Sequence, residues 1–241
     1  MIKSIDDESL GSWLIERLRN RYDIAKFGFI SSFIRRGDRN PFKILVATIL
    51  SQNSTDKAAM AAYRNLEKIV DITPSSIAKL NSKVIASAIK PAGLHRSKAE
   101  AIKKLSRIII TKYGGDLSNL LKKDVIDARR ELMELPKVGP KTSDVLLVSM
   151  GILKTVPVDT HISRIAKRLG LVPLKADYET IRKRLDEIFR EDDRYEAHLL
   201  LILHGRETCK AINPLCNECV INERCAYYKS LIRQNYICTR T

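Results

Sequence analysis

The spacing of apolar residues constrains the fold of this chain most, because it repeats with the period of an α-helix. Intervals of three and four residues place these side chains on one helical face. The clearest stripes are Ile102-Leu105-Ile109, Ile162-Ile165-Ala166-Leu169 and Tyr178-Ile181-Leu185-Ile188, and the segments 42–52, 55–69, 82–90 and 124–134 also have helical patterns. Alternating strand patterns and Asn-Gly hairpin turns are missing, so the sequence predicts an all-α protein with about ten helices and short loops.

Residue types that begin and end helices flank these stripes. Asp159 and Asp177 each precede a stripe, where a carboxylate can accept hydrogen bonds from the N–H groups of the first turn. Gly170 and the pair Gly114-Gly115 follow stripes, and glycine readily adopts the left-handed conformation that ends many helices.

The charge of the chain favours a polyanionic partner. Its 43 Lys and Arg residues exceed its 28 Asp and Glu residues by 15, and each phosphate neutralised by a basic side chain releases counterions. A solvated basic surface is the alternative explanation. The N-terminal residues 1–18 do not resemble a signal peptide, and no apolar run approaches the roughly 18 residues of a membrane span. We therefore expect an intracellular protein, cytoplasmic or nucleoid-associated, with no membrane partner.

Residues 135–144 have the composition of two helices joined by a tight turn. Leu132 and Leu135 give the first helix an apolar side, and residues 136–139 form the turn. Pro140 suits the first position of the second helix, where its missing N–H costs nothing. Such a turn exposes backbone N–H groups that can bind a DNA phosphate. A plain helix–loop–helix packing unit is the alternative, but we favour DNA binding through Lys137, Val138 and Gly139.

Four of the five cysteines lie within residues 209–225 and are expected to bind metal. In a reducing compartment, clustered cysteines indicate a metal site rather than disulfides. Four thiolates suit either a zinc ion or an iron–sulfur cluster. Zinc sites usually pair two short Cys-x2–4-Cys knuckles, and gaps of six and five residues do not form that pattern. The predicted ligands are Cys209, Cys216, Cys219 and Cys225, with Cys238 as a spare thiol.

An ordered set of motifs resembles the endonuclease III family, the iron–sulfur branch of the helix–hairpin–helix DNA glycosylases. The motifs are Ile-Leu-Ser-Gln-Asn-Ser-Thr-Asp (49–56), Ala-Gly-Leu-His-Arg-Ser-Lys-Ala (92–99), Leu-Pro-Lys-Val-Gly-Pro-Lys-Thr (135–142), Val-Asp-Thr-His (158–161), Leu-His-Gly-Arg (203–206) and the four cysteines. The resemblance implies an all-α, two-lobed helix–hairpin–helix DNA glycosylase fold with a C-terminal [4Fe–4S] cluster loop, and it favours that cluster over zinc.

The resemblance also implies a division into two lobes. A six-helix lobe would span residues 34–153 and include the helix–hairpin–helix at 124–150. The second helical lobe would combine residues 1–33 with 154–241 and contain the cluster loop at 209–225. DNA would lie in the groove between the lobes.

By the same resemblance, the activity would be that of a bifunctional DNA glycosylase and AP lyase. Lys141 lies in the first turn of a helix, whose dipole disfavours an ammonium ion and so favours a neutral, nucleophilic amine. It would attack C1′ of a flipped nucleotide, expel the base, form a Schiff base and nick the strand 3′ to the site by β-elimination. Asp159, otherwise only a helix cap, would stabilise oxocarbenium character and shuttle protons. The partner would be double-stranded DNA with oxidised pyrimidines, such as thymine glycol, or abasic sites, and the protein a monomer.

The family opens the duplex with side chains from two loops, which fill the gap left by the flipped base. Here Gln52 and Asn53 would come from the first loop, and Leu94 with His95 from the second. Helix capping by Gln52 and Asn53, and core packing of Leu94, are the alternatives. Lys210, beside the cysteines, would meet a phosphate.

The chain departs from the family pattern in its hairpin and in its first loop. The family's hairpin glycine is replaced by Lys137, which would be strained if the position requires positive φ. Pro140 replaces a polar or basic residue, and the family's glutamine aligns with Asn53 instead of Gln52. These departures leave the chemistry intact and bear on the preferred lesion. Two rival functions stay open: a monofunctional uracil or mismatched-thymine DNA glycosylase, and a non-catalytic DNA-binding module with a structural metal.

Overall fold

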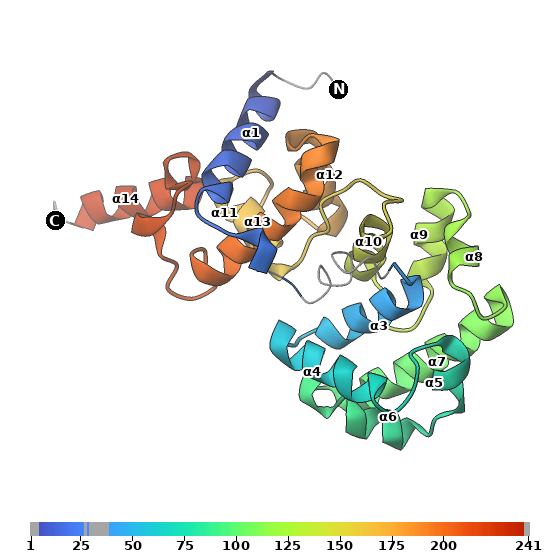
Figure 1. The fold of residues 1–241 in the computed structure, drawn as a ribbon. Helices are drawn as coiled ribbons and strands as arrows, with labels where there is room; N and C mark the ends of the chain where they lie inside the picture. Colours follow the sequence, from blue (N-terminus) through green and yellow to red (C-terminus); the bar gives the residue numbers. More distant parts are fainter. Residues whose placement is uncertain (1–4, 27, 29–38, 239–241) are drawn as a thin grey trace. The chain divides into compact units, whose positions relative to one another are not determined.

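The computed structural model describes residues 5–26, 28 and 39–238, and every regular element among them is a helix (Figure 1). The all-α prediction is therefore confirmed. The chain divides into two compact units, which we name the hairpin unit, residues 28–153, and the cysteine unit, residues 1–27 with 154–241. The predicted lobe boundary at residues 33 and 34 lies outside the described residues, as does the side chain of Cys238, so both remain predictions.

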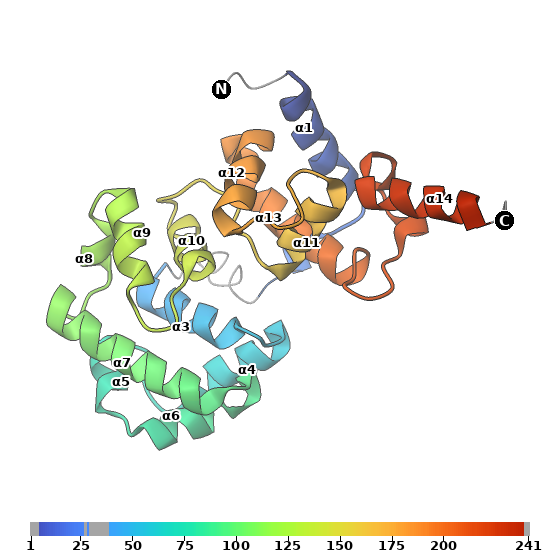
Figure 2. The same cartoon turned by 180° about the vertical axis from the view of Figure 1, so that it is seen from behind.

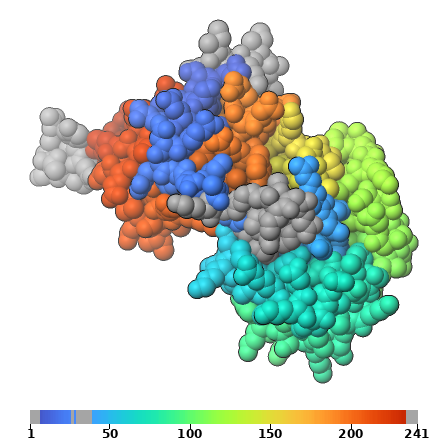
Figure 3. All heavy atoms as spheres, in the orientation of Figure 1, coloured from blue at the N-terminus to red at the C-terminus, as the bar shows by residue number. Residues whose placement is uncertain are grey.

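The hairpin unit is organised around one central helix. Its elements are α3 (Pro41–Ser51), α4 (Asp56–Glu67), α5 (Pro74–Lys79), α6 (Ser82–Ala88), η2 (Lys90–Ala92), α7 (His95–Tyr113), α8 (Ser118–Leu121), α9 (Val125–Met133) and α10 (Pro140–Ser149). Helix α3 is apolar on every side and almost wholly buried, as expected for a helix in the middle of a bundle. Helices α4, α7 and α10 pack on it, and α7 packs on α5 and α6, which lie in the teal surface of Figure 3.

The cysteine unit joins the N-terminal helix to the C-terminal part of the chain. Its elements are α1 (Ile5–Arg19), η1 (Ile24–Lys26), α11 (Thr160–Leu169), α12 (Tyr178–Ile188), η3 (Glu191–Asp193), α13 (Arg194–Glu207), η4 (Cys216–Glu218), η5 (Asn222–Arg224) and α14 (Ala226–Cys238). Helix α13 is buried along most of its length, and both α1 and α11 pack against it. Helix α1, blue in Figure 3, also packs on α12.

Two ion pairs and one glycine attach α1 to the rest of the cysteine unit. Arg184 on α12 donates two hydrogen bonds to Asp7, at 2.8 and 2.7 Å, and Arg19 donates two to Glu196 on α13, at 2.8 and 2.7 Å. A Cβ atom at Gly11 would lie 2.2 Å from the carbonyl oxygen of Ile188, so only glycine permits α1 to approach α12 this closely.

The predicted apolar stripes are the buried faces of α7, α11 and α12. Ile102, Leu105 and Ile109 are fully buried in the core of the hairpin unit, and the corresponding residues of α11 and α12 line the core of the cysteine unit. Asp159 and Asp177 cap their helices as predicted. Within the described residues, none of the helices combines the length and apolar character needed to cross a bilayer.

Candidate active site and metal centre

The turn between α9 and α10 has the predicted hairpin conformation, and the two helices lie side by side in both views (Figures 1 and 2). The backbone N–H of Val138 donates to the carbonyl of Leu135 at 3.0 Å, which closes the turn. Lys137 has a φ of 60°, in the region that favours glycine, and its side chain is exposed. The strain that the sequence suggested at Lys137 is therefore present, and it costs roughly 1–2 kcal/mol.

The first turn of α10 is open to an anion. Gly139 precedes the helix with an extended backbone and no side-chain cap, and Pro140 follows at the first turn. Gly139 is exposed, and a Cβ atom there would meet nothing within 4 Å, so a ligand has room to approach the backbone. A helix N-terminus of this kind attracts phosphate. Lys141 lies in this turn with its side chain half-buried.

Val138 differs from Gly139 in what it can offer a ligand. Its side chain is 4% exposed and belongs to the core of the hairpin unit, while its N–H is used within the turn. The geometry therefore favours Gly139 over Val138 as the donor to a phosphate.

A buried ion pair fixes the orientation of α10 against α9. Asp144 is fully buried, and it accepts hydrogen bonds from Nε and Nη2 of Arg129, at 2.5 and 3.3 Å. The carbonyl of Pro140 accepts from the hydroxyl of Ser143 at 2.9 Å, which tightens the turn that contains Lys141. These contacts hold the backbone of Lys141 in one position relative to the hairpin.

Gln52 connects the end of α3 to the hairpin. Its side-chain Nε2 donates to the carbonyl of Lys137 at 2.9 Å and to Oγ1 of Thr142 at 3.1 Å. The amide that the sequence suggested for insertion into DNA therefore has contacts within the hairpin unit. Asn53, the next residue, is exposed and has a φ of 50°.

Leu94 is an exposed leucine in a strained backbone conformation. Its φ is 47° and its side chain is 59% exposed, so the alternative of core packing is wrong for this residue. His95 follows as the first residue of α7 and is partly exposed. An exposed apolar side chain at the tip of a loop suits a wedge that enters a base stack.

Asp159 is the N-cap of α11. Its Oδ1 accepts from the N–H of Ile162 at 2.8 Å, and the residue is partly exposed. Capping by one carboxylate oxygen leaves the second oxygen available for chemistry. His161, two residues on, lies within 3.1 Å of Arg164 through Nδ1, and it leaves no room for a Cβ atom at Gly205, which would lie 2.6 Å away. Lys141 and Asp159 belong to different units.

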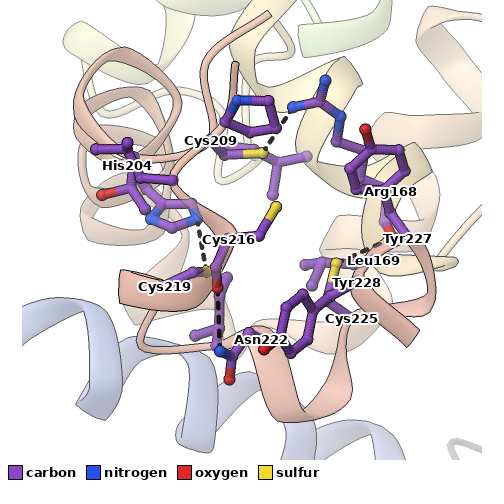
Figure 4. Close-up of a pocket in the computed structure, with 15 residues that line it drawn as sticks. Arg168, Leu169, His204, Cys209, Cys216, Cys219, Asn222, Cys225, Tyr227 and Tyr228 are labelled. Carbon is purple, nitrogen blue, oxygen red and sulfur yellow. Dashed lines mark hydrogen bonds between the residues drawn. The ribbon is translucent and has the colours of Figure 1, made fainter. Parts of the chain in front are cut away.

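The four predicted cysteine ligands surround one pocket of the cysteine unit (Figure 4). All four are free thiols and partly buried. Their neighbours Ile165, Leu169 and Ile221 make part of the lining apolar. In the described residues, no group of three or more His, Cys, Asp or Glu side chains is arranged around a point suited to a single metal ion. The donor set nevertheless fits a group large enough to reach all four sulfur atoms.

Arg168 supports the loop that contains the first cysteine. Its Nη1 donates to Sγ of Cys209 at 3.4 Å and to the carbonyl of Lys210 at 2.6 Å, while its guanidinium lies 4.8 Å from the ring centre of Tyr227. Lys210 itself is exposed, as a phosphate-binding residue would need to be.

His204 connects the pocket to a buried polar chain. Its Nε2 lies 3.7 Å from Sγ of Cys219, its Nδ1 lies 3.0 Å from the Tyr22 hydroxyl, and that hydroxyl lies 2.6 Å from Oγ1 of Thr208. Burial, with a contribution from Arg164, lowers the pKa of His204 to about 4, so the ring is neutral near pH 7. When Cys219 is a thiolate, the donors can run in one direction, from Thr208 through Tyr22 and His204 to the sulfur.

Burial also affects the thiols themselves. It raises the pKa of Cys219 to about 11 and raises that of Cys216, with the neighbouring thiols adding to both shifts. Without a metal these two groups are therefore protonated near neutral pH, and metal binding must release their protons.

The sequence did not predict the contacts of Tyr22, Arg168 and His204, or those of Lys98, whose Nζ donates to the carbonyls of Leu50, Gln52 and Ala92 in the hairpin unit. Lys98 and His204 lie inside the motifs that carry the family resemblance, but the sequence gives no physical reason why a lysine or a histidine is needed there. Tyr22 is more than 180 residues from its partners His204 and Thr208, and no sequence pattern predicts such a contact.

Known proteins resemble this chain over most of its length. A family model described as HhH-GPD superfamily base excision DNA repair protein matches residues 46–191, which include the hairpin and Asp159. Endonuclease III of Sulfolobus acidocaldarius is 39% identical over 225 residues, covering 93% of this chain and 99% of that protein. A non-covalent endonuclease III–DNA complex has a TM-score of 0.70 at 32% identity, over 80% of this chain and 86% of that one. A trapped covalent endonuclease III–DNA intermediate has a TM-score of 0.71 at 29% identity, and the match covers 90% of this chain and 98% of that one.

Proposed function

Because the chain belongs to the endonuclease III family of base excision repair DNA glycosylases, we propose that it removes oxidised pyrimidines, such as thymine glycol, from duplex DNA and then cleaves the strand. The observation that carries the proposal is the position of Lys141. It lies in the first turn of α10, behind a hairpin that exposes Gly139 and Lys137. The +15 charge suits a DNA substrate.

Lys141 is the proposed nucleophile. Its neutral amine attacks C1′ of the flipped nucleotide as the bond from C1′ to the base breaks, and the base leaves with the bonding electrons and takes up a proton. Loss of a proton from nitrogen and opening of the sugar ring then give a Schiff base. The trapped covalent intermediate of a relative supports a covalent step of this kind. The lysine is held by the turn that Asp144 and Arg129 fix in place.

The Schiff base makes strand cleavage possible without a metal-activated water. It acidifies the protons on C2′, so that removal of one of them expels the 3′ phosphate by β-elimination. Water then releases Lys141 from the product. We assign Asp159 to the proton transfers and to stabilising positive charge on the sugar as the base leaves. The capping bond to Ile162 occupies Oδ1 and orients the carboxylate, so the second oxygen can do this chemistry.

Asn53 and Leu94 are the side chains that we propose to enter the duplex. Both are exposed, and both have the positive φ values of loop tips. The family's glutamine aligns with Asn53, and Gln52 supports the hairpin instead through its bonds to Lys137 and Thr142. An apolar wedge stabilises the opened stack, while the amide of Asn53 can pair with the orphaned base.

The thiolate pocket is proposed to hold a [4Fe–4S] cluster. Each thiolate of such a cluster binds its own iron, whereas a zinc ion gathers four sulfurs at about 2.3 Å from one point. The four cysteines line one pocket, and their gaps of six and five residues do not form the paired short knuckles of zinc sites, which supports the cluster. Its role is structural: it joins the loop from Cys209 to Cys225 to α11 and α13, whose side chains share the pocket lining.

The reaction is tested on duplexes that carry thymine glycol, uracil opposite guanine, or thymine opposite guanine. We expect the wild-type protein to release thymine glycol and to nick the strand before any alkaline treatment. Base release that requires alkali for strand scission would contradict the lyase step and indicate a monofunctional glycosylase. Damage-selective binding without base release would contradict both catalytic steps and indicate a binding module.

A further inference from the structure

Lys98 is a buried lysine on α7 whose ammonium group contacts three backbone carbonyls. The residue is 1% exposed, and its Nζ donates to the carbonyls of Leu50, Gln52 and Ala92 at 2.8, 2.7 and 2.9 Å. Three acceptors match the three donors of an ammonium group. Among the described residues, no carboxylate forms an ion pair with Lys98, and the dipoles of the three peptide carbonyls stabilise its charge.

The three carbonyls lie at the bases of two loops. Leu50 and Gln52 are at the end of α3, directly before Asn53, and Ala92 ends η2, directly before Gly93 and Leu94. One ammonium group therefore joins two segments that are about forty residues apart in sequence. The segments that it joins end in the exposed, left-handed residues Asn53 and Leu94.

Holding a charge in this position is unfavourable. Burial lowers the pKa of Lys98 to about 8, and the positive charge of Lys137 in the hairpin turn adds to the effect. An apolar side chain of similar length would avoid this cost but would leave three carbonyls without these hydrogen bonds. The ammonium group thus stabilises one arrangement of the two loops, although burying its charge costs more free energy than burying an apolar side chain would.

We propose that Lys98 is a positioning residue for opening the duplex: it holds the loops of Asn53 and Leu94 at a fixed separation so that both side chains enter the base stack together. The inference rests on the proposed function, because it requires that these loops open DNA. Lys98 itself touches no substrate and acts through the two backbone segments. Its loss should therefore impair base flipping more than the chemistry at Lys141.

The test compares Lys98→Met with the matched variant Lys103→Met. Lys103 is also on α7 and donates one bond, at 2.6 Å, to the carbonyl of Leu80, which belongs to neither loop. Duplex opening is followed by the fluorescence of 2-aminopurine placed beside thymine glycol, together with the rate of base release. Borohydride trapping on a single-stranded abasic oligonucleotide reports the chemistry without any need to open a duplex.

We expect Lys98→Met to lower base release from the duplex by about tenfold or more and to remove most of the fluorescence rise, with single-strand trapping within about twofold of wild type. Lys103→Met should match wild type in all three assays. Normal duplex opening by Lys98→Met, or an equal loss in the duplex and single-strand assays, overturns the inference.

Two further outcomes are distinguishable. Absence of duplex opening in wild type and Lys103→Met overturns the proposed function and the inference with it. If Lys98→Met does not fold, as judged by circular dichroism, Lys98→Gln serves instead, because its amide keeps two of the three donors, and the same losses are expected in weaker form. Failure of both variants to fold overturns the inference, because the contact would then be a general requirement of folding.

Discussion

Arg129 on α9 and Asp144 on α10 form a buried, two-point ion pair that joins the two helices of the hairpin. Asp144 is completely buried, and the Arg129 side chain is 18% exposed. Since the hairpin presents both Gly139 and Lys141, this pair links the stability of the fold to the geometry of the proposed nucleophile.

Replacement of Arg129 by leucine should destabilise the hairpin unit by about 3–5 kcal/mol, because it removes a positive charge and two hydrogen bonds from the buried carboxylate of Asp144. Urea unfolding measures the change. Arg130→Leu is the control, since Arg130 pairs with Asp127 on the surface and its loss should cost at most about 1 kcal/mol. Equal effects of the two substitutions would contradict the assignment.

Lys137 lowers the stability of the hairpin through its backbone strain, but it adds a positive charge for DNA binding. Lys137→Gly should raise the free energy of unfolding by roughly 0.5–1 kcal/mol, because glycine adopts the observed φ of 60° without strain but gains more freedom in the unfolded chain. The same variant should bind DNA more weakly, with the slope of log K against log salt reduced by about one. Lys137→Ala separates the effects, since it should lose DNA affinity without the gain in stability. A gain in stability with alanine would contradict this explanation.

The buried charge of Lys98 gives the stability a defined pH dependence. The pKa in the folded state is about 8, below the ordinary value of 10.5. Below pH 8 both states are protonated, and the unfavourable burial of the charge is fully present. Between pH 8 and 10.5 the unfolded state binds more protons than the folded state. The free energy of unfolding therefore increases with pH in this window, by at most about 1.4 kcal/mol per pH unit.

The measurement is urea unfolding of wild type and Lys98→Met across this pH window. Subtracting the two curves removes groups that titrate in both proteins. Wild type should gain stability relative to the variant as the pH rises, and a difference that stays flat or falls would contradict the assignment.

Removal of one thiolate tests the cluster. Cys219→Ala should abolish a broad visible absorption and lower the iron content, and the cysteine unit should lose stability as its loop is released. Cys238→Ala, outside the predicted ligand set, should keep both the colour and the iron. A colourless wild-type protein with one zinc ion per chain would contradict the cluster.

The sequence predicted most clearly those helices that have one apolar face. The stripes of α7, α11 and α12 are buried as expected, with ends at the predicted capping residues. Helix α13 was not predicted, because it is buried along most of its length and its apolar residues form no single stripe. A helix enclosed by neighbours loses the periodic contrast on which such predictions depend.

The candidate site was predictable where function depends on local sequence and not where it depends on tertiary contacts. The hairpin turn, the capping role of Asp159 and the clustering of four thiols follow from residues close together in the chain. The hydrogen bonds from Lys98 to backbone carbonyls form only when distant segments pack together. The same is true of the hydrogen bonds that join Thr208 to His204 through Tyr22. Hydrogen bonds to backbone carbonyls leave no mark in a sequence, since every residue has one.

The most direct test of the central claim is borohydride trapping on a duplex with one abasic site, comparing wild type with Lys141→Ala. The neighbouring variant Lys137→Ala controls for the loss of a positive charge in the hairpin. We predict a covalent protein–DNA adduct with wild type and Lys137→Ala, and none with Lys141→Ala. Absence of an adduct with folded, iron-loaded wild type, or an undiminished adduct with Lys141→Ala, would contradict the assignment of Lys141 as the nucleophile.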